Sequence, residues 1–119
     1  YINSSQLLDA SYNLKGTKIF FAGQISGVEG YVESISSGLV AGINAANLLE
    51  GREKTIFDEE TITGALAKYI STENDDFQPM NANFGIFHLV TFAKKKDRKA
   101  SYAPQATALI QQMIDDGKL

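Results

Sequence analysis

The sequence predicts an α/β fold in which helices outweigh a few short strands. Three observations carry this prediction: an apolar run over residues 18–22, a glycine-bearing loop over residues 23–30, and apolar residues at helical spacing from there to Gly51. A short apolar run that ends at a glycine is typical of a buried parallel strand, and a glycine after a periodic stretch is typical of a helix end. The first predicted unit is therefore strand, loop and long helix.

The predicted long helix is unusual in its small residues. Gly38 and Gly42 lie one turn apart, although each interior glycine costs about 1 kcal/mol relative to alanine. This spacing predicts a surface pressed closely against the helix, and the nearby charges of Glu29 and Glu33 argue against a membrane span. The apolar positions at helical spacing are Val32, Ile35, Leu39, Ile43 and Ala46.

Two further helices are predicted after residue 51. The first takes Asp58 as its N-cap, has Glu59 and Glu60 in its first turn, and ends near Ser71. Residues 74–87 mix aromatic residues with Asn, Pro and Gly, which predicts an ordered loop that packs. The last helix follows a basic run and has Pro104 near its first turn. Its apolar face comprises Leu109, Ile110, Met113 and Ile114, before a stop at Gly117.

Composition excludes several classes of site and of protein. The 119 residues include no cysteine and one histidine, so a disulfide framework, a thiolate nucleophile and a Cys or His metal cluster are not expected. No leader-like stretch begins the chain, which favours a cytoplasmic protein. The net charge is −3, but residues 94–99 carry five basic residues and one acid, leaving six basic and thirteen acidic residues elsewhere. A basic segment therefore accompanies an acidic body.

The loop over residues 23–30 is the strongest candidate site. It feeds a helix amino terminus, where unpaired backbone amides suit an anion. Its glycine spacing is neither the dinucleotide fingerprint G-x-G-x-x-G nor a P-loop, so ligand contact and a tight structural turn both stay open. Glu29 and Glu33 could form an acid–base pair, but first-turn carboxylates are explained by the helix dipole alone. His88, in an apolar setting, is better explained as a structural residue.

The basic run also permits two interpretations. Its side chains could contact a phosphate backbone in a salt-sensitive way, or they could be a solvated charge run before a helix. The residues concerned are Lys94, Lys95, Lys96, Arg98 and Lys99.

A longer pattern adds a family resemblance. Residues 23–34 read GQISGVEGYVES and residues 38–46 read GLVAGINAA, and together they resemble the closing flavin-binding segment of the folate- and FAD-dependent tRNA uracil-5-methyltransferases. Residues 1–4, 77–81 and 83–85 and the basic run before a terminal helix extend the resemblance to nearly the whole chain. The related wobble-uridine modifying flavoproteins of the GidA type usually carry threonines in place of Val28 and Glu29, so they are the second choice.

The resemblance implies a fold, a reaction and ligands. The fold would be the carboxy-terminal part of a FAD/NAD(P)-binding, Rossmann-like domain of the glutathione-reductase type, with residues 1–51 closing the FAD-binding domain and residues 52–119 forming a helical extension packed on it. The complete enzyme would make ribothymidine in the tRNA T loop, with methylenetetrahydrofolate as carbon donor, reduced FAD as reductant and NAD(P)H as electron source. The rest of the flavoprotein chain would be a partner, and self-association of the fragment is also expected.

The resemblance also assigns site residues. The cofactor-binding residues would be Gly23, Gln24, Gly30, Tyr31 and Val32, mostly through backbone amides, together with Glu33 as a partner of the helix dipole or a polar contact. Asn81, Asn83 and Phe84 would lie near the folate or substrate pocket, and the basic run would meet tRNA. The family's glycine fingerprint and catalytic cysteines are missing from this chain, so no catalytic residue, no metal ligand and no activity of the chain alone are expected. The rival of another class is a nucleic-acid-binding module in which the loop is only a turn.

Overall fold

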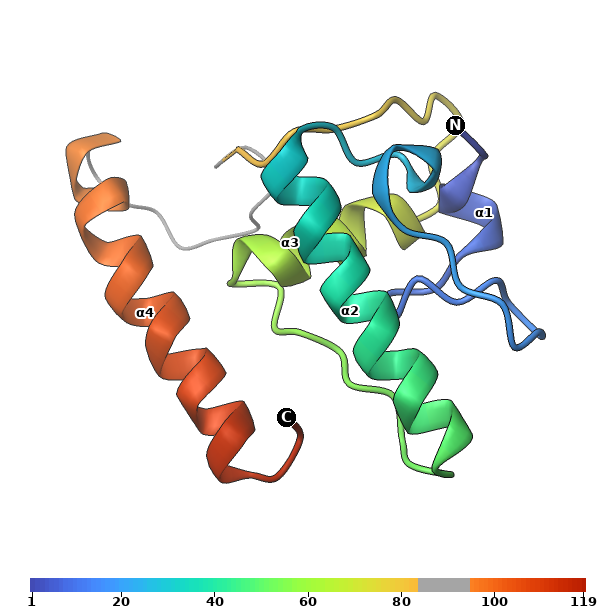
Figure 1. The fold of residues 1–119 in the computed structure, drawn as a ribbon. Coiled ribbons are helices and arrows are strands. Elements are labelled where there is room, and N and C mark those ends of the chain that lie inside the picture. Colours follow the sequence, from blue (N-terminus) through green and yellow to red (C-terminus); the bar gives the residue numbers. More distant parts are fainter. Residues whose placement is uncertain (84–94) are drawn as a thin grey trace.

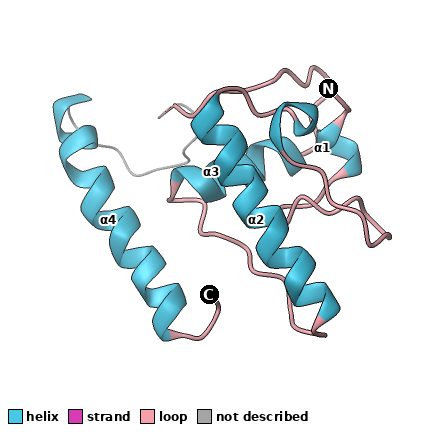
Figure 2. Cartoon of the chain, viewed as in Figure 1, coloured by secondary structure: helices cyan, strands magenta, loops and turns pink. Residues whose placement is uncertain are grey.

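The computed structural model describes residues 1–83 and 95–119, with the side chains of residues 102–119 in the second range. Within these ranges Figure 2 shows helices joined by loops, and no strand. In Figure 1, α2 crosses in front of α3, and α4 runs along one side. The elements in order are α1 (Ser4–Leu7), the 3-10 helix η1 (Gly23–Ser26), α2 (Tyr31–Leu49), α3 (Ile62–Ser71) and α4 (Lys95–Asp115).

The strand predicted over residues 18–22 does not form within the described residues. Phe20 makes one isolated antiparallel bridge with Asn13. The Asn13 carboxamide donates to the backbone carbonyls of Thr17 and Ile19, both at 3.0 Å. A strand needs a second extended segment along its whole length. Here the preceding chain folds into a turn held by Asn13, so the apolar run has one bridge in place of a ladder.

The long helix is confirmed as α2, and a polar face anchors it. Its buried residues include Ser37, Asn44 and Asn47. Asn44 donates from Nδ2 to the Thr55 carbonyl at 2.9 Å, and its Oδ1 accepts from the Thr55 N–H at 2.7 Å. The Asn47 amide donates to the Thr55 hydroxyl at 2.9 Å. The side chains of two asparagines therefore hold the extended segment after α2, and Asn44 does so with the pair of hydrogen bonds that a neighbouring backbone would make.

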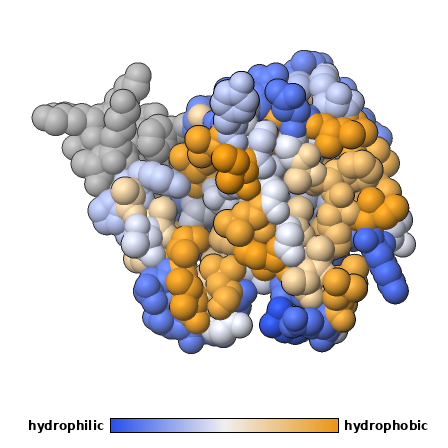
Figure 3. Space-filling model, viewed as in Figure 1, coloured by the Kyte–Doolittle hydropathy of each residue, from blue (hydrophilic) through white to orange (hydrophobic). Residues whose placement is uncertain are grey.

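Val40 and Ala41 of α2 enter the core, but a second apolar face of the helix is turned outward. On the face of the molecule that α2 crosses in Figure 1, the space-filling view of Figure 3 shows hydrophobic side chains gathered at the surface. No atom of the described residues lies within 4 Å of a Cβ built on Gly38 or Gly42, apart from the helix backbone and chain neighbours. The close contact predicted for this face is therefore not made by the described residues. Its exposed large side chains are Tyr31, Val32, Ile35 and Leu39.

The start of α3 corrects one prediction. Thr61, rather than Asp58, is the N-cap, and its hydroxyl accepts from the Gly64 N–H at 3.0 Å. The Asp58 carboxylate instead accepts from the Glu60 N–H at 2.8 Å, which closes a turn ahead of the helix. Asp and Thr are both common in turns and at helix N-caps, and here the turn takes Asp58 whereas the N-cap takes Thr61. The predicted end near Ser71 is confirmed.

The beginning of α4 corrects a second prediction. The helix starts inside the basic run, and Pro104 lies in its interior rather than near its first turn. Proline in a helix removes one backbone hydrogen bond at a cost of about 3 kcal/mol. Contacts on both sides of Pro104 offset this loss, because the Tyr102 hydroxyl accepts from the Ile62 N–H at 2.8 Å and the Gln105 amide donates to Glu60 at 2.7 Å.

One core connects these elements. Met113 of α4 is buried with residues of α2 and α3 and of the intervening loops, and the Thr55 hydroxyl donates to the Lys118 carbonyl at 2.9 Å. None of the helices in the described ranges combines the length and apolar character needed to cross a bilayer. The core cluster comprises Leu8, Tyr12, Val28, Val40, Ala41, Phe57, Leu66, Ala67, Ile70, Phe77 and Met113.

Substitution of Asn44 tests the polar anchor of α2. Asn44→Ala leaves the Thr55 N–H and carbonyl without their partner in a buried position. Because each unsatisfied buried group costs about 1–3 kcal/mol, we expect the free energy of unfolding in urea to fall by about 2–4 kcal/mol. The exposed Gln112→Ala is the control and should change it by less than about 0.5 kcal/mol. Equal effects of the two substitutions would contradict a structural role for Asn44.

A second prediction concerns acid stability. Burial acts to raise the pKa of Asp9, but hydrogen bonds from Lys54 and Ser11 outweigh it, so the folded-state pKa lies below the usual 3.8. A lowered carboxyl pKa stabilises the fold above 3.8, and this contribution is lost as pH falls through the folded-state value. We expect Asp9→Asn to be less stable than the parent chain at pH 7 and equal to it near pH 2. Urea unfolding at both pH values measures this, and a difference that persists at pH 2 would refute it.

Candidate functional site

The loop before α2 is held from both sides by serines. The Gly23 N–H donates to the Ser37 hydroxyl of α2 at 2.8 Å, and Ser37 in turn donates to the Ser34 carbonyl at 2.8 Å. On the other side, the Ser4 hydroxyl of α1 donates to the Ser26 carbonyl at 2.6 Å. Ser4, Ser26 and Ser37 are all buried. The loop is therefore pinned to both α1 and α2.

An aromatic ring and a short bridge fix the second half of the loop. Gly27 has φ +92°, and a Cβ built there would lie 2.4 Å from Cζ of Phe77, so only glycine fits under this ring. Next to it, Val28 forms a parallel bridge with Met80. The Glu29 N–H donates to the Met80 carbonyl at 3.0 Å, and the Met80 N–H donates to the Gly27 carbonyl at 2.9 Å. The 77–80 segment thus lies against the loop.

A cavity of about 510 Å³ opens where the loop meets α2. Four of the six residues predicted from sequence to contact a cofactor line it, and Ser34 was not predicted. Ser34 follows Gly30 by one helical turn, so the spacing of the helix could have indicated it. Val32 is 76% exposed and is not among the lining residues. The lining residues are Gly23, Gln24, Gly30, Tyr31 and Ser34.

The backbone at the start of α2 can offer hydrogen-bond donors to an electron-rich ligand in this cavity. Gly30 is the N-cap of α2, and as a glycine it has no side chain that could accept from the first N–H groups of the helix. The first backbone N–H groups of a helix have no intrahelical partner, and the helix dipole places partial positive charge at this end. The first N–H groups of α2 lie beside the cavity, since Gly30, Tyr31 and Ser34 line it. The geometry can therefore bind an anion or the negatively polarised edge of a ring.

Glu33 makes a long-range contact that the sequence did not predict. Its Oε1 accepts from the Ala82 N–H at 3.2 Å. A Cβ built on Gly30, which has φ +99°, would lie 2.1 Å from the other carboxylate oxygen, Oε2. The carboxylate therefore lies against Gly30 and ties residues near Ala82 to the start of α2. Sequence reasoning identified the first-turn acid but could not show its long-range partner.

The predicted substrate residues lie partly within the described chain. Asn81 and Asn83 are exposed, and Asn83 donates to the Asn81 carbonyl at 2.9 Å. The Met80 bridge and the Ala82–Glu33 hydrogen bond place both beside the loop. Phe84, His88 and Lys94 lie outside the described residues, as do the side chains of Lys95, Lys96, Arg98 and Lys99.

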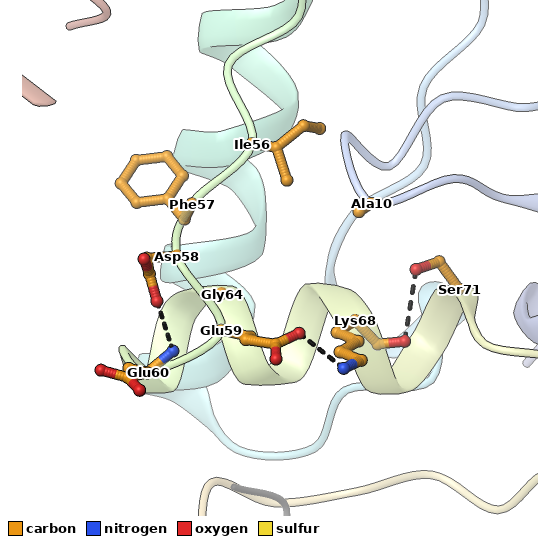
Figure 4. Close-up of a pocket in the computed structure, with 9 residues that line it drawn as sticks. All are labelled: Ala10, Ile56, Phe57, Asp58, Glu59, Glu60, Gly64, Lys68 and Ser71. Carbon is orange, nitrogen blue, oxygen red and sulfur yellow. Dashed lines mark hydrogen bonds and ion pairs between the residues drawn. The ribbon is translucent and has the colours of Figure 1, made fainter. Parts of the chain in front are cut away.

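A second, acid-rich cavity of about 730 Å³ lies beside α3 (Figure 4). Its polar groups interact with one another: Lys68 pairs with Glu59 at 2.5 Å, and the Asp58 carboxylate accepts from the Glu60 N–H. Within the described residues, no three Asp, Glu, His or Cys side chains gather as a metal site. Gly64 packs closely on the Asp58 carbonyl in this lining, since a Cβ built on Gly64 would lie 2.0 Å from that oxygen.

Comparison with known proteins agrees with the resemblance stated above. The family model described as glucose inhibited division protein A matches residues 1–53, which include the loop and all of α2. Curated relatives extend the similarity over nearly the whole chain. They carry the name methylenetetrahydrofolate–tRNA-(uracil-5-)-methyltransferase TrmFO.

Three relatives illustrate the match. The protein of Bacillus subtilis is 53% identical over 115 residues, which are 93% of this chain and 26% of the relative. That of Bacillus licheniformis is 50% identical over 117 residues, 95% of this chain and 27% of the relative. That of Anoxybacillus flavithermus is 48% identical over 120 residues, 96% of this chain and 27% of the relative. The chain thus matches a segment of the methylenetetrahydrofolate–tRNA-(uracil-5-)-methyltransferases, and it spans about a quarter of the length of these relatives.

Proposed function

We propose that this chain is the flavin-contacting segment of a tRNA methyltransferase that makes ribothymidine in the T loop. The carbon donor would be methylenetetrahydrofolate, NAD(P)H would supply electrons, and reduced FAD would be the reductant. The observation that carries the proposal is the cavity at the start of α2, lined by Gly23, Gln24, Gly30 and Tyr31. The names of the relatives, which give the folate and the tRNA uracil, support the reaction.

The residues of the cavity fit a flavin in two ways. Gly23 and Gly30 leave the backbone open to a flat ring, and the start of α2, with a glycine as its N-cap, offers N–H groups to negative charge. When bound, reduced FAD supplies the electrons that convert the one-carbon unit to a methyl group. The part of this chain is to bind and orient the ring and to stabilise negative charge on its polar edge.

The proposal includes an arrangement of the longer protein. Residues 1–51 would close a Rossmann-like FAD-binding domain of the glutathione-reductase type, and residues 52–119 would form the extension packed on it. Catalytic residues would come from the remainder of a cytoplasmic flavoprotein. Asn81, Asn83 and Phe84 would border the folate or substrate pocket, which is supported by the hydrogen bonds that hold residues 80–83 beside the loop. Lys94–Lys99 would contact tRNA phosphates.

A wobble-uridine modifying flavoprotein is the second candidate, because the family model that matches residues 1–53 is the broader GidA family. Analysis of the modified tRNA separates the two, since ribothymidine supports the methyltransferase and a carboxymethylaminomethyl uridine supports the rival. A colourless longer protein that binds tRNA without a flavin band would favour the third reading, a nucleic-acid-binding module.

Substitution of Gly30 in the longer protein tests the cofactor cavity. Gly30→Ala forces a Cβ into the space of the Glu33 carboxylate and disfavours φ +99°, so the first N–H groups of α2 must shift. We expect the dissociation constant for FAD, measured by flavin fluorescence, to rise at least about tenfold, or 1.4 kcal/mol.

Gly51→Ala is the matched control for Gly30→Ala. Gly51 also has a positive φ, +69°, but lies beyond the other end of α2 with no atom within 4 Å of a built Cβ. It should cost about 1–2 kcal/mol of stability without changing FAD affinity. Unchanged FAD binding by Gly30→Ala in a folded protein would sink the proposed site.

Substitution of Glu33 separates two roles. Glu33→Ala removes the acceptor for the Ala82 N–H, whereas Glu33→Gln keeps an oxygen there. In the longer protein we expect Glu33→Ala to raise the KM for methylenetetrahydrofolate several-fold with FAD content unchanged, and Glu33→Gln to restore most of the loss. Loss of FAD from both variants would instead support the direct cofactor contact predicted from sequence.

A further inference from the structure

Helix α2 differs from an ordinary surface helix because it also has an apolar stripe on its outward face. Surface helices turn an apolar stripe to the core and polar residues to water. The face that α2 turns to the described chain combines the core residues Val40 and Ala41 with three buried polar residues, Ser37, Asn44 and Asn47. The opposite face is apolar: Tyr31 is 91% exposed, Val32 76%, Ile35 72% and Leu39 59%.

These four side chains form one stripe, because the spacings 31, 35, 39 and 32, 35, 39 follow successive helical turns. Apolar residues scattered singly over a surface need no explanation, but a contiguous patch marks a surface that another element covers. The polar face is saturated by hydrogen bonds within the chain. Only the apolar stripe is left to be buried.

Gly38 and Gly42 lie on the same face as the stripe. Their Cβ positions are open, with no atom of the described residues within 4 Å apart from the helix backbone and chain neighbours. Glycine in a helix interior is unfavourable and gains nothing in contact with water. Its use here is to let another backbone approach the helix more closely than a side chain would permit.

We propose that the α2 stripe, defined as Tyr31, Val32, Ile35, Gly38, Leu39 and Gly42, is the docking surface for the remainder of the same longer polypeptide. About three quarters of each relative's length lies outside the segment that this chain matches. A polypeptide of that length supplies a covering surface of sufficient size in every molecule. The partner's contacting face is apolar and approaches α2 at the two glycines.

The stripe also joins the cavity of the proposed cofactor site. Tyr31 belongs to both, and the cavity is lined on this side by the loop and the start of α2. The polypeptide that covers the stripe therefore provides the facing wall of that cavity. This part of the inference rests on the proposed function, whereas the docking itself does not.

Single cysteines in the longer protein test the docking. Ile35→Cys and Leu39→Cys are treated with a maleimide in the native and the denatured state, and labelling of the peptide that contains each cysteine is measured by mass spectrometry. We expect native labelling to be at least tenfold slower than denatured labelling. Sedimentation velocity at the labelling concentration reports whether the protein is monomeric.

Two outcomes would overturn the inference. One is native labelling as fast as denatured labelling. The other is protection that disappears when a dimer is diluted to monomer, because it would assign the stripe to a second copy. The visible spectrum of each variant is recorded separately. A colourless protein with protected cysteines would contradict the proposed function alone, and a yellow protein with freely labelled cysteines would contradict the docking alone.

Substitution of the two glycines by alanine gives a second test, in which the sign of the change in Tm is decisive. On an open helix face, Gly→Ala raises the Tm by about 2–4 °C. We expect Gly38→Ala and Gly42→Ala to lower the Tm of the longer protein, since a Cβ would meet the covering backbone. Thr107→Ala on the exposed side of α4 is the control and should leave the Tm unchanged or slightly raised. A raised Tm for both glycine variants would refute the close approach.

Discussion

The paired hydrogen bonds between Asn44 and Thr55 are the contact on which the rest of the chain depends. A single buried carboxamide satisfies both the N–H and the carbonyl of Thr55, while the Thr55 hydroxyl links Asn47 to the Lys118 carbonyl. Three parts of the chain therefore meet at one residue: α2, the extended segment after it, and the residues that follow α4. Buried polar groups left without partners are costly, so this arrangement strongly favours one register of the segment against the helix.

This polar anchor has a consequence for the opposite side of α2. Serines and asparagines supply much of the attachment of the helix by hydrogen bonds, and of its apolar residues Val40 and Ala41 enter the core, whereas those of the outer stripe do not. They remain available to a second surface. An apolar attachment on the inner face and a polar outer face would have given an ordinary surface helix with no stripe to cover.

The start of α2 combines several constraints at one place. The Phe77 ring covers Gly27, the Met80 bridge aligns residues 77–80 with the loop, and the Glu33 carboxylate fills the space beside Gly30. The first two contacts join residues about 50 positions apart in the sequence, and the Glu33 carboxylate also accepts from the Ala82 N–H, 49 positions later. The cavity at this end of the helix is thus rigidly framed before any ligand is bound, which suits a site that must orient a ring.

The sequence by itself determined the local elements and the position of the strongest candidate site. Periodicity predicted α2 and the end of α3, and four of the six residues assigned to the cofactor line the cavity beside Gly30, because loop glycines followed by a helix start leave a local signal. The assignments that failed were decided by contacts between distant segments. The run over residues 18–22 lacks a neighbouring strand, Thr61 takes the cap that Asp58 offered, and Pro104 is held inside α4 by contacts with α3 and the turn before it.

Only the tertiary structure decided which face of α2 is buried and what Glu33 binds. The helical spacing shows an apolar and a polar face, but it cannot show that the polar face is satisfied by Thr55 and Gly23, or that Ala82 lies within reach of a carboxylate 49 residues earlier. The physical reason is that hydrogen bonds satisfied across the fold make burial of polar residues favourable, and this satisfaction depends on three-dimensional proximity, which a one-dimensional pattern does not contain.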